Sequence, residues 1–488
     1  MQRLLICTLI ALLGMGASAI AQSPEATPEK AAQIDAFVEG RLAALGLPGA
    51  AVALIQDGEI VHSRGFGVTE LDGDVVVTAD TPFELGSVSK SFAATAILLL
   101  QEDELLSVDD PVVKHLHNFR THRAFRSDQI TLRHLLTHRS GLSTFDGNRT
   151  QARFDTSEEA LAAAVGTLTS VRLQSDPGDA YAYSNANYLL LGAVIERVSG
   201  QSYEDFVAER ILQPLGMQNS WAGPTLEGRS AGAAPHRYWF GAVQRQNAKP
   251  TRVNMAYGGM RSSANDLAKY LISFSDAERA LLSRDSLAEM TTSAAPGETP
   301  AYGFGWFIAE SEEYKLVFHT GANPGFNTIA GYSPDGDFGF VALVNGQSTF
   351  TDQNALSLSA GVADLLLNRP PPPAASPLLI RVARGAVLAL PFALLIWVGV
   401  VVVRWLRRGF RPVSDLTPMG IAGRVVLPSL FALALAYGLV GILPRLNNAP
   451  LSAIHQFSPD MGFVLVASAV IAVIAAIGRL VLRVRPRG

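Results

Sequence analysis

A potential nucleophile and a potential base stand together in the stretch FELGSVSK, residues 83–90, which opens a strongly apolar segment. The apolar pattern predicts a helix over residues 87–103, on which Ser87 and Lys90 share one face. A serine hydroxyl is a poor nucleophile unless a nearby base accepts its proton. Burial and the positive end of a helix both lower the pKa of a lysine, so Lys90 is a candidate for that base. A capping serine followed by a surface lysine gives the same pattern, so this stretch alone does not establish catalysis.

A second segment, PGDAYAYSN at residues 177–185, forms a predicted turn before the next helix. A tyrosine beside a lysine cation loses its proton more easily, which makes Tyr183 a second candidate base. The amide of Asn185 can hold the lysine or a substrate carbonyl. For this segment alone, a packed tyrosine and a helix-capping asparagine are the alternative interpretation.

A third segment, FHTGA at residues 318–322, predicts a strand against which a ligand can lie, because Gly321 has no side chain. Thr320 can donate a hydrogen bond to a substrate carboxylate. The backbone N–H of Ala322 is a candidate donor to a developing oxyanion, together with the N–H of the serine in the first segment. Taken alone, His319 is more typical of an ordinary strand residue.

Together, in this order and spacing, the three segments resemble the serine β-lactamase and penicillin-binding-protein superfamily, most closely its class C branch of β-lactamase-related serine hydrolases. The parent pattern is S-x-x-K, a second polar triplet and K-T-G. Here the triplet is Y-S-N, as in the class C branch, and the third motif is H-T-G. The likeness covers roughly residues 32–366 and includes ITLRHLLTHRSGL at 130–142, YGGM at 257–260 and YGFGW at 302–306.

The resemblance implies a role for each of these groups. Ser87 would be the acylated nucleophile, and Lys90 with Tyr183 its base and later proton donor. The substrate site would comprise Asn185, which orients the lysine and the substrate amide, His319, Thr320 and Gly321, with the N–H groups of Ser87 and Ala322 as the oxyanion hole. A histidine is mostly neutral at pH 7, so His319 attracts a substrate carboxylate less than the usual lysine. This argues against antibiotic resistance as the main role. The resemblance implies no cofactor and no metal.

Composition and charge exclude several other functions. Residues 379–488 carry twelve Arg, no Lys and two acidic residues, so the net charge of −4 leaves −14 on residues 1–378. An acidic main body argues against nucleic acid as a partner. The single cysteine, Cys7, excludes an intramolecular disulfide and a cysteine zinc site. His134 and His138 are spaced like a zinc pair, but no H-E-x-x-H glutamate accompanies them.

The body of the chain, residues 32–367, predicts an α+β domain. Strand-like segments occur at both ends, at 50–56 and 60–68 and again at 303–309, 316–319, 327–332 and 338–344. Helical patterns lie between them, at 87–103, 131–137, 187–199 and 203–211. The sequence therefore predicts an antiparallel sheet completed by both ends of the body and flanked by helices, plus a helical region, as in the β-lactamase/transpeptidase fold. A linker at 22–31 precedes this domain, and a Pro-rich spacer at 368–384 follows it.

Both ends of the chain predict membrane targeting. Residues 1–21 have the pattern of a signal peptide, with an uncleaved anchor as the alternative. Three apolar stretches at 385–403, 425–443 and 461–478 are each long enough to span a bilayer, forming a membrane domain at 385–488. The excess of Arg in the first connection and after the last span places both on the cytoplasmic side. We therefore expect a multi-pass protein of the bacterial cytoplasmic membrane, with its C-terminus cytoplasmic and the catalytic domain on the periplasmic or outer side.

Three functions agree with these observations. The first is a membrane-anchored serine hydrolase that forms an acyl-serine intermediate, in its sharpest form a D-alanyl-D-alanine carboxypeptidase acting on a peptide. The second is an esterase or a weak class C-type β-lactamase acting on a small molecule. The third is a non-catalytic substrate-binding module, which has no need of Ser87, Lys90 and Tyr183 together. The expected partners are the substrate and the lipid bilayer, and a protein partner is not predicted.

Overall fold

The computed structural model describes residues 24–224, 232–247, 249–295, 297, 301–311, 314–349, 351–408 and 416–484. The predicted signal peptide at 1–21 lies outside the described residues. The chain divides into two compact units, Met1–Thr349 with Gln353–Ala375, and Phe350–Asp352 with Ser376–Gly488. We describe each unit by itself.

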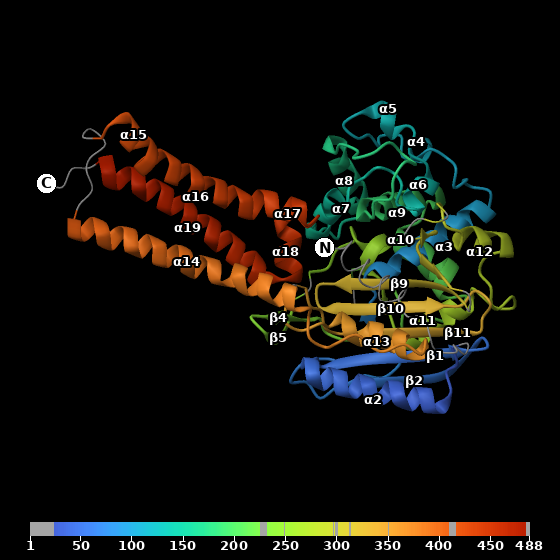
Figure 1. Ribbon diagram of the computed structural model, residues 1–488. Helices are drawn as coiled ribbons and strands as arrows, with labels where there is room; N and C mark the ends of the chain where they lie inside the picture. The colour runs from blue at the N-terminus through green and yellow to red at the C-terminus, as the bar shows by residue number, and fades with distance from the viewer. Residues whose placement is uncertain are drawn as a thin grey trace. The chain divides into compact units, whose positions relative to one another are not determined.

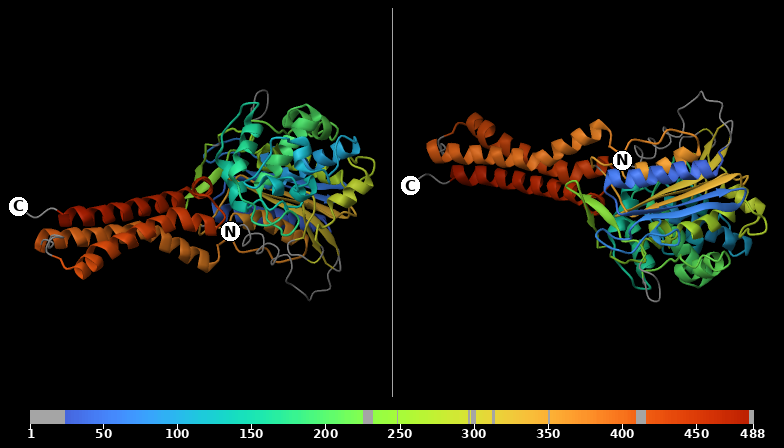
Figure 2. Two further views of the ribbon diagram at one scale, coloured as in Figure 1. Left: turned by 90° about the horizontal axis from the view of Figure 1, so that it is seen from above. Right: turned by 90° about the horizontal axis from the view of Figure 1, so that it is seen from below.

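The first unit is built on a seven-stranded sheet in which all neighbouring strands are antiparallel (Figures 1 and 2). The strand order is β2-β1-β11-β10-β9-β8-β7. The strands are β1 (Gly49–Gln56), β2 (Glu59–Gly67), β7 (Ala301–Tyr302), β8 (Phe307–Glu310), β9 (Lys315–Asn323), β10 (Phe326–Tyr332) and β11 (Phe338–Val344). Because β1 pairs directly with β11, both ends of the body complete one sheet, which confirms the predicted α+β fold.

Helices cover both faces of this sheet. Helices α2 (Pro28–Leu45) and α13 (Leu356–Leu366) pack together and contact strands β1, β10 and β11, and α11 (Ala264–Ile272) contacts β1, β10 and β11 as well (Figure 1). Alternate residues of β1 enter two different cores: Ala50, Val52 and Leu54 lie with α2 and α13, whereas Ala51, Ala53 and Ile55 lie with α11. A strand buried on both faces reads as a continuous apolar run, which is the pattern of β1.

The helical region is centred on α3 (Ser89–Glu102), which is buried along most of its length and packs against α9 (Asn185–Ser199). The other short elements of this unit are β3 (Phe83–Glu84), η1 (Gly86–Val88), α4 (Val112–His115), α5 (Ala124–Ser127), α6 (Leu132–Leu136), α7 (Thr144–Arg149), η2 (Thr150–Ala152), α8 (Ala160–Gly166), η3 (Thr167–Ser170), α10 (Tyr203–Val207), η4 (Ala208–Leu212), η5 (Met255–Gly259), β6 (Arg261–Ser262) and α12 (Arg284–Met290), together with β4 (His236–Trp239) and β5 (Ala242–Arg245), which form a separate two-stranded sheet. This region supplies the first two motif segments, and the sheet supplies the third.

Several predicted boundaries differ from the observed ones. Helix α2 begins at Pro28, inside the expected linker 22–31, because Thr27 caps it and a proline suits the first helical position. Strand β9 is longer than the predicted 316–319 and reaches Asn323. The helix expected at 87–103 begins as the 3₁₀ turn η1 before α3.

The second unit contains three helical segments long and apolar enough to cross a membrane, Leu378–Arg407, Pro418–Leu446 and Pro459–Val481. They are formed by α14 (Leu378–Arg408), by the series α15 (Pro418–Ile421), η7 (Ala422–Val426), α16 (Leu427–Tyr437), η8 (Gly438–Ile442) and α17 (Leu443–Leu446), and by α19 (Pro459–Val484), with the short helix α18 (Leu451–Phe457) before α19. Helix α19 packs against both α14 and α16, where small side chains such as Ala436 and Ala472 allow close approach.

These helices extend beyond the predicted apolar stretches, and α14 begins inside the expected spacer 368–384. The extensions bring an ion pair into the second unit. Arg384 on α14 lies 3.2 Å from Asp460 on α19, and both side chains are buried, at 5% and 0% exposure. Arg384 also contacts the more exposed Asp352 at 2.9 Å. The apolar stretch 385–403 begins one residue after Arg384, and the stretch 461–478 begins one residue after Asp460.

Replacing Arg384 and replacing Asp460 should have different effects on stability, because each substitution leaves a different buried charge behind. Arg384→Met leaves the buried Asp460 carboxylate without its cation, so we expect a loss of about 3–5 kcal/mol of stability. Asp460→Leu should cost less, because Arg384 keeps Asp352. The double variant should lie near the wild type, since apolar residues replace a buried pair at little cost. The midpoint of SDS-induced unfolding of the full chain in mild detergent, followed by circular dichroism, measures the order. A double variant as unstable as Arg384→Met would contradict it.

Candidate active site

Ser87 lies in the turn η1, which follows strand β3 and leads directly into α3. Gly86 before it has a φ of +53°, a backbone conformation that favours glycine. A Cβ at Gly86 would also lie 2.5 Å from the backbone nitrogen of Ala322 on β9. Glycine therefore lets the turn with the serine approach β9 closely, and it places the amide of Ala322 beside this turn. The Ser87 side chain remains partly exposed.

Lys90 is completely buried on the first turn of α3. Its Nζ lies 3.0 Å from Ser87 Oγ and 2.8 Å from the backbone oxygen of Tyr257 in η5. Burial lowers the pKa of Lys90 well below its ordinary value. Because a carbonyl only accepts, one N–H of Lys90 is committed to Tyr257, so once the amine is deprotonated its lone pair is available to the Ser87 hydroxyl.

Tyr183 is the third group at the serine. Its hydroxyl interacts with the Ser87 side chain, which lowers the pKa of the hydroxyl, and its ring lies 4.9 Å from Lys90 Nζ. Burial raises the pKa of Tyr183 above its ordinary value. This shift is opposite to the one expected beside a lysine cation, because burial of the phenol outweighs the interaction with Ser87, which lowers the pKa. The arrangement therefore favours Lys90 as the base and Tyr183 as a neutral phenol that donates.

Strand β9 forms the wall opposite the serine. A Cβ at Gly321 would lie 1.9 Å from the backbone oxygen of Leu85 and 2.0 Å from Thr328 Oγ1, so only glycine fits. The side chain of Thr320 is partly exposed, and its hydroxyl makes no hydrogen bond to another described residue. This hydroxyl is therefore available to a substrate.

His319 on the same strand is buried and uncharged. Its Nδ1 lies 2.6 Å from the backbone oxygen of Thr320 and must donate to it, so Nε2 accepts from the Tyr302 hydroxyl at 3.1 Å. Burial is the main cause that lowers the pKa of His319 to about 3. The group that replaces the usual lysine of the third motif thus carries no charge near pH 7.

Asn185 occupies the first position of α9 beside this site. Its Nδ2 donates to Asn148 Oδ1 at 3.1 Å, and its Oδ1 is buried without a partner among the described residues. Lys90 forms its hydrogen bonds with Ser87 and Tyr257 and not with Asn185. The expected contact between Asn185 and Lys90 is therefore replaced by a backbone carbonyl, and the free Oδ1 is left to accept from a substrate.

Two contributors were missed by sequence reasoning. One is the Tyr257 carbonyl, because the YGGM pattern indicates only the family resemblance. The other is His138, because its four-residue spacing from His134 suggests only a zinc pair. His138 Nδ1 accepts from the N–H of Ser184 at 3.2 Å and from Asn187 at 2.9 Å, and its ring centroid lies 4.3 Å from that of Tyr183. His138 therefore fixes the turn that carries the tyrosine.

His134 has a different task. Its Nδ1 accepts from the backbone N–H of Thr131 at 3.3 Å and closes the capping box of α6. Within the described ranges, no group of three or more His, Cys, Asp or Glu side chains is arranged to hold a metal ion.

The profile of the beta-lactamase family matches residues 34–363, so the chain belongs to this family. The chain is 28% identical over 336 residues to Protein flp of Staphylococcus aureus (strain MW2), with 66% of this chain and 65% of that protein covered. The chain thus spans about two thirds of the length of this relative.

Solved structures give the same family fold. The octameric penicillin-binding protein homologue from Pyrococcus abyssi superposes with a TM-score of 0.60 and 29% identity, over 74% of this chain and 81% of that one. The D-amino acid amidase from Ochrobactrum anthropi SV3, in complex with D-phenylalanine, gives a TM-score of 0.57 and 25% identity, over 69% and 98%. The chain is therefore a member of a β-lactamase-fold serine hydrolase family.

The buried His319 makes stability depend on pH. Its folded-state pKa of about 3 lies below the ordinary 6.5, so the unfolded chain binds the proton more tightly. The contribution of His319 is complete above pH 6.5 and is lost as the pH falls toward 3. Between pH 7 and pH 4 the loss is about 3 kcal/mol for this one group.

His319→Gln should therefore flatten the acid limb of stability, measured by urea unfolding of the full chain in detergent at several pH values. The exposed His122→Gln is the matched control and should leave the limb unchanged. Equal acid sensitivity of His319→Gln and the wild type would contradict the assignment.

Proposed function

We propose that this beta-lactamase-family chain is a membrane-anchored serine hydrolase that forms an acyl-serine intermediate at Ser87. The observation that carries the proposal is the convergence of two groups on the Ser87 side chain. The desolvated Lys90 amine lies 3.0 Å from Ser87 Oγ, and the Tyr183 hydroxyl interacts with the same side chain. A pure binding module has no use for a neutral lysine beside a serine hydroxyl.

The geometry supports the following sequence of steps. Ser87 Oγ attacks the substrate carbonyl as its proton passes to Lys90 Nζ, and the N–H groups of Ser87 and Ala322 stabilise the oxyanion. Tyr183 donates its proton to the leaving group as that bond breaks, and it recovers a proton from Lys90. Water then hydrolyses the acyl ester with the same groups in reverse.

The preferred substrate is a peptide with a D-amino acid, as in a D-alanyl-D-alanine carboxypeptidase. The D-amino acid amidase of Ochrobactrum anthropi shares the fold over nearly its whole length, which supports this choice. Asn185 Oδ1 is free to accept from the substrate amide N–H, and the Thr320 hydroxyl is free to donate to a carboxylate.

One observation favours a second candidate, an esterase or weak β-lactamase. His319 is neutral where a lysine would attract a carboxylate, so the site does not require an anionic substrate. A neutral ester would enter without losing an ion pair.

We also propose the location of the enzyme. Helices long enough to span a bilayer lie in the second unit, and arginines concentrate between the first two spans and after the last. This distribution supports an odd number of crossings, with the catalytic domain on the extracytoplasmic side and the C-terminus in the cytoplasm. A cleaved signal peptide at 1–21 would agree with it.

Labelling with a fluorescent penicillin tests the three groups. Ser87→Ala should abolish labelling, and Lys90→Ala should slow it roughly 10²–10⁴-fold, because the proton acceptor is lost. Tyr183→Phe keeps the ring beside Lys90 and removes only the hydroxyl, so labelling should slow without loss of fold. Unchanged labelling of Lys90→Ala would refute its role as the base.

Substrate class is decided by one comparison. We expect the purified full chain to hydrolyse a D-Ala-D-Ala peptide faster than nitrocefin or a short-chain aryl ester, with Ser87→Ala as the blank. Faster turnover of the ester would favour the second candidate.

Acylation should also depend on pH in a stated direction. Because the pKa of Lys90 is well below 10.5, the neutral base is present at pH values where a solvated lysine would be charged. The acylation rate should therefore rise through an acid limb well below pH 10.5 and then level off. A limb centred near the ordinary lysine pKa would contradict a desolvated base.

A further inference from the structure

We propose that Asn323 is a positioning residue for acylation, because its side-chain amide fixes the glycine peptide next to the carbonyl that orients Lys90. The inference rests on the proposed function and deepens it. Neither the S-x-x-K, Y-S-N and H-T-G motifs nor their roles include this residue.

Two glycines follow the carbonyl that holds the lysine. Tyr257 supplies the carbonyl, and Gly258 and Gly259 come next. The N–H groups of both glycines bond to the backbone oxygen of Asn254, at 2.7 and 2.8 Å. The second of these bonds holds the N–H side of the peptide between the glycines. Because glycine tolerates a wide range of backbone angles, a contact to the carbonyl side of this peptide restricts it further.

Asn323 supplies that contact from the end of β9. Its side chain is buried, with 7% exposure, and its Nδ2 donates both hydrogens. One bond of 2.6 Å goes to the backbone oxygen of Gly258, and the other of 2.9 Å goes to Glu84 Oε2. Glu84 is held in turn by Arg261 at 2.7 Å. A charged acceptor strengthens the bond to the amide and prevents it from turning over.

These contacts join the three parts of the site. Glu84 belongs to β3, three residues before Ser87, and Asn323 follows Ala322 directly on β9. Gly258 belongs to the segment that holds Lys90. One amide therefore keeps the nucleophile, the oxyanion strand and the acceptor of the base in register.

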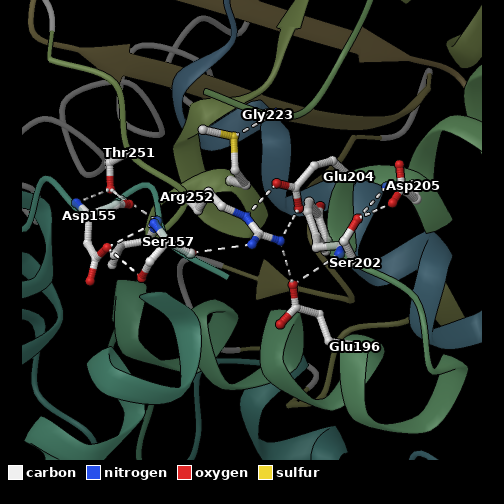
Figure 3. A network of polar contacts seen from close by, with 12 residues as sticks. Asp155, Ser157, Glu196, Ser202, Glu204, Asp205, Gly223, Thr251 and Arg252 are labelled. Carbon is white, nitrogen blue, oxygen red and sulfur yellow. Dashed lines mark hydrogen bonds and ion pairs between the residues drawn. The ribbon is translucent and has the colours of Figure 1, made fainter. Parts of the chain in front are cut away.

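The segment 252–260 is held at both ends by contacts that do not involve Asn323. At its start, Arg252 donates to Glu204 at 2.6 and 3.0 Å, to Glu196 at 3.3 Å and to the backbone oxygen of Ser157 at 3.3 Å (Figure 3). At its end, the backbone of Met260 bonds to Leu85 at 2.9 Å and to Ser89 Oγ at 3.2 Å. Loss of the Asn323 amide should therefore loosen only the glycine peptide, without unfolding the segment.

The test measures acylation without assuming the natural substrate. The burst of p-nitrophenol from p-nitrophenyl acetate reports acylation of Ser87 in the full chain, and Ser87→Ala is the blank. Asn323→Leu should slow the burst about tenfold. It should also move the acid limb of the burst rate to lower pH, because a charged lysine is less stable without its fixed hydrogen-bond acceptor.

Asn327→Leu is the matched control. Asn327 is equally buried, at 4% exposure, and donates one bond of 3.1 Å to the backbone oxygen of Gly346, away from Lys90. Its replacement should leave the acid limb in place even where stability falls. If Asn323→Leu does not fold, Glu84→Gln keeps the shape and weakens the bond to Asn323, and it should give a smaller shift in the same direction.

The outcomes separate the two proposals. A wild-type burst that is absent, or is unchanged in Ser87→Ala, overturns the proposed function and this inference with it. A wild-type burst together with an unshifted acid limb in Asn323→Leu, or in Glu84→Gln where the first variant does not fold, overturns the positioning role alone. An equal shift in Asn327→Leu would also overturn it, because the effect would then be general loosening of the sheet.

Discussion

The cost of burying a lysine amine governs the arrangement around Ser87. Lys90 has no exposed surface, and its partners among the described residues are a hydroxyl, a backbone carbonyl and aromatic rings, with no carboxylate. A charged ammonium is costly in such surroundings, so the pKa of Lys90 falls well below its ordinary value. The aromatic packing, the position of Tyr257 and the close approach of β9 all serve to keep water from this one group.

The same exclusion of water sets the state of the neighbouring groups. The pKa of Tyr183 rises and that of His319 falls, in both cases chiefly through burial. The site is therefore a set of buried hydrogen-bonding groups, and burial disfavours the charged form of each of these three side chains. Recognition of the substrate then depends on shape and on hydrogen bonds more than on an ion pair.

Much of this could be predicted from the sequence, because the motifs carry their chemistry in side chains. Ser87, Lys90 and Tyr183 have rare combinations of type and spacing, and alternating or continuous apolar runs indicated the strands of the sheet. The acceptor of Lys90 could not be predicted in this way, since every residue carries a carbonyl and only the fold selects that of Tyr257. Asn323 was invisible for a related reason: its partners are distant in sequence, at Glu84 and Gly258. The sequence also did not indicate that the amide of Asn185 donates to Asn148, because that contact again depends on the fold.

The pairing of β1 with β11 has a consequence for how the catalytic unit forms. Strand β1 (Gly49–Gln56) can pair with β11 (Phe338–Val344) only after β11 has been synthesised. The contact between them at the centre of the sheet therefore joins residues that are far apart in the sequence. Closing such a long loop costs entropy before any contact repays it, and folding by this route is slow. The hairpin of β1 and β2 thus lacks its partner β11 until nearly the whole unit has been synthesised, which leaves one edge of β1 open for most of that time.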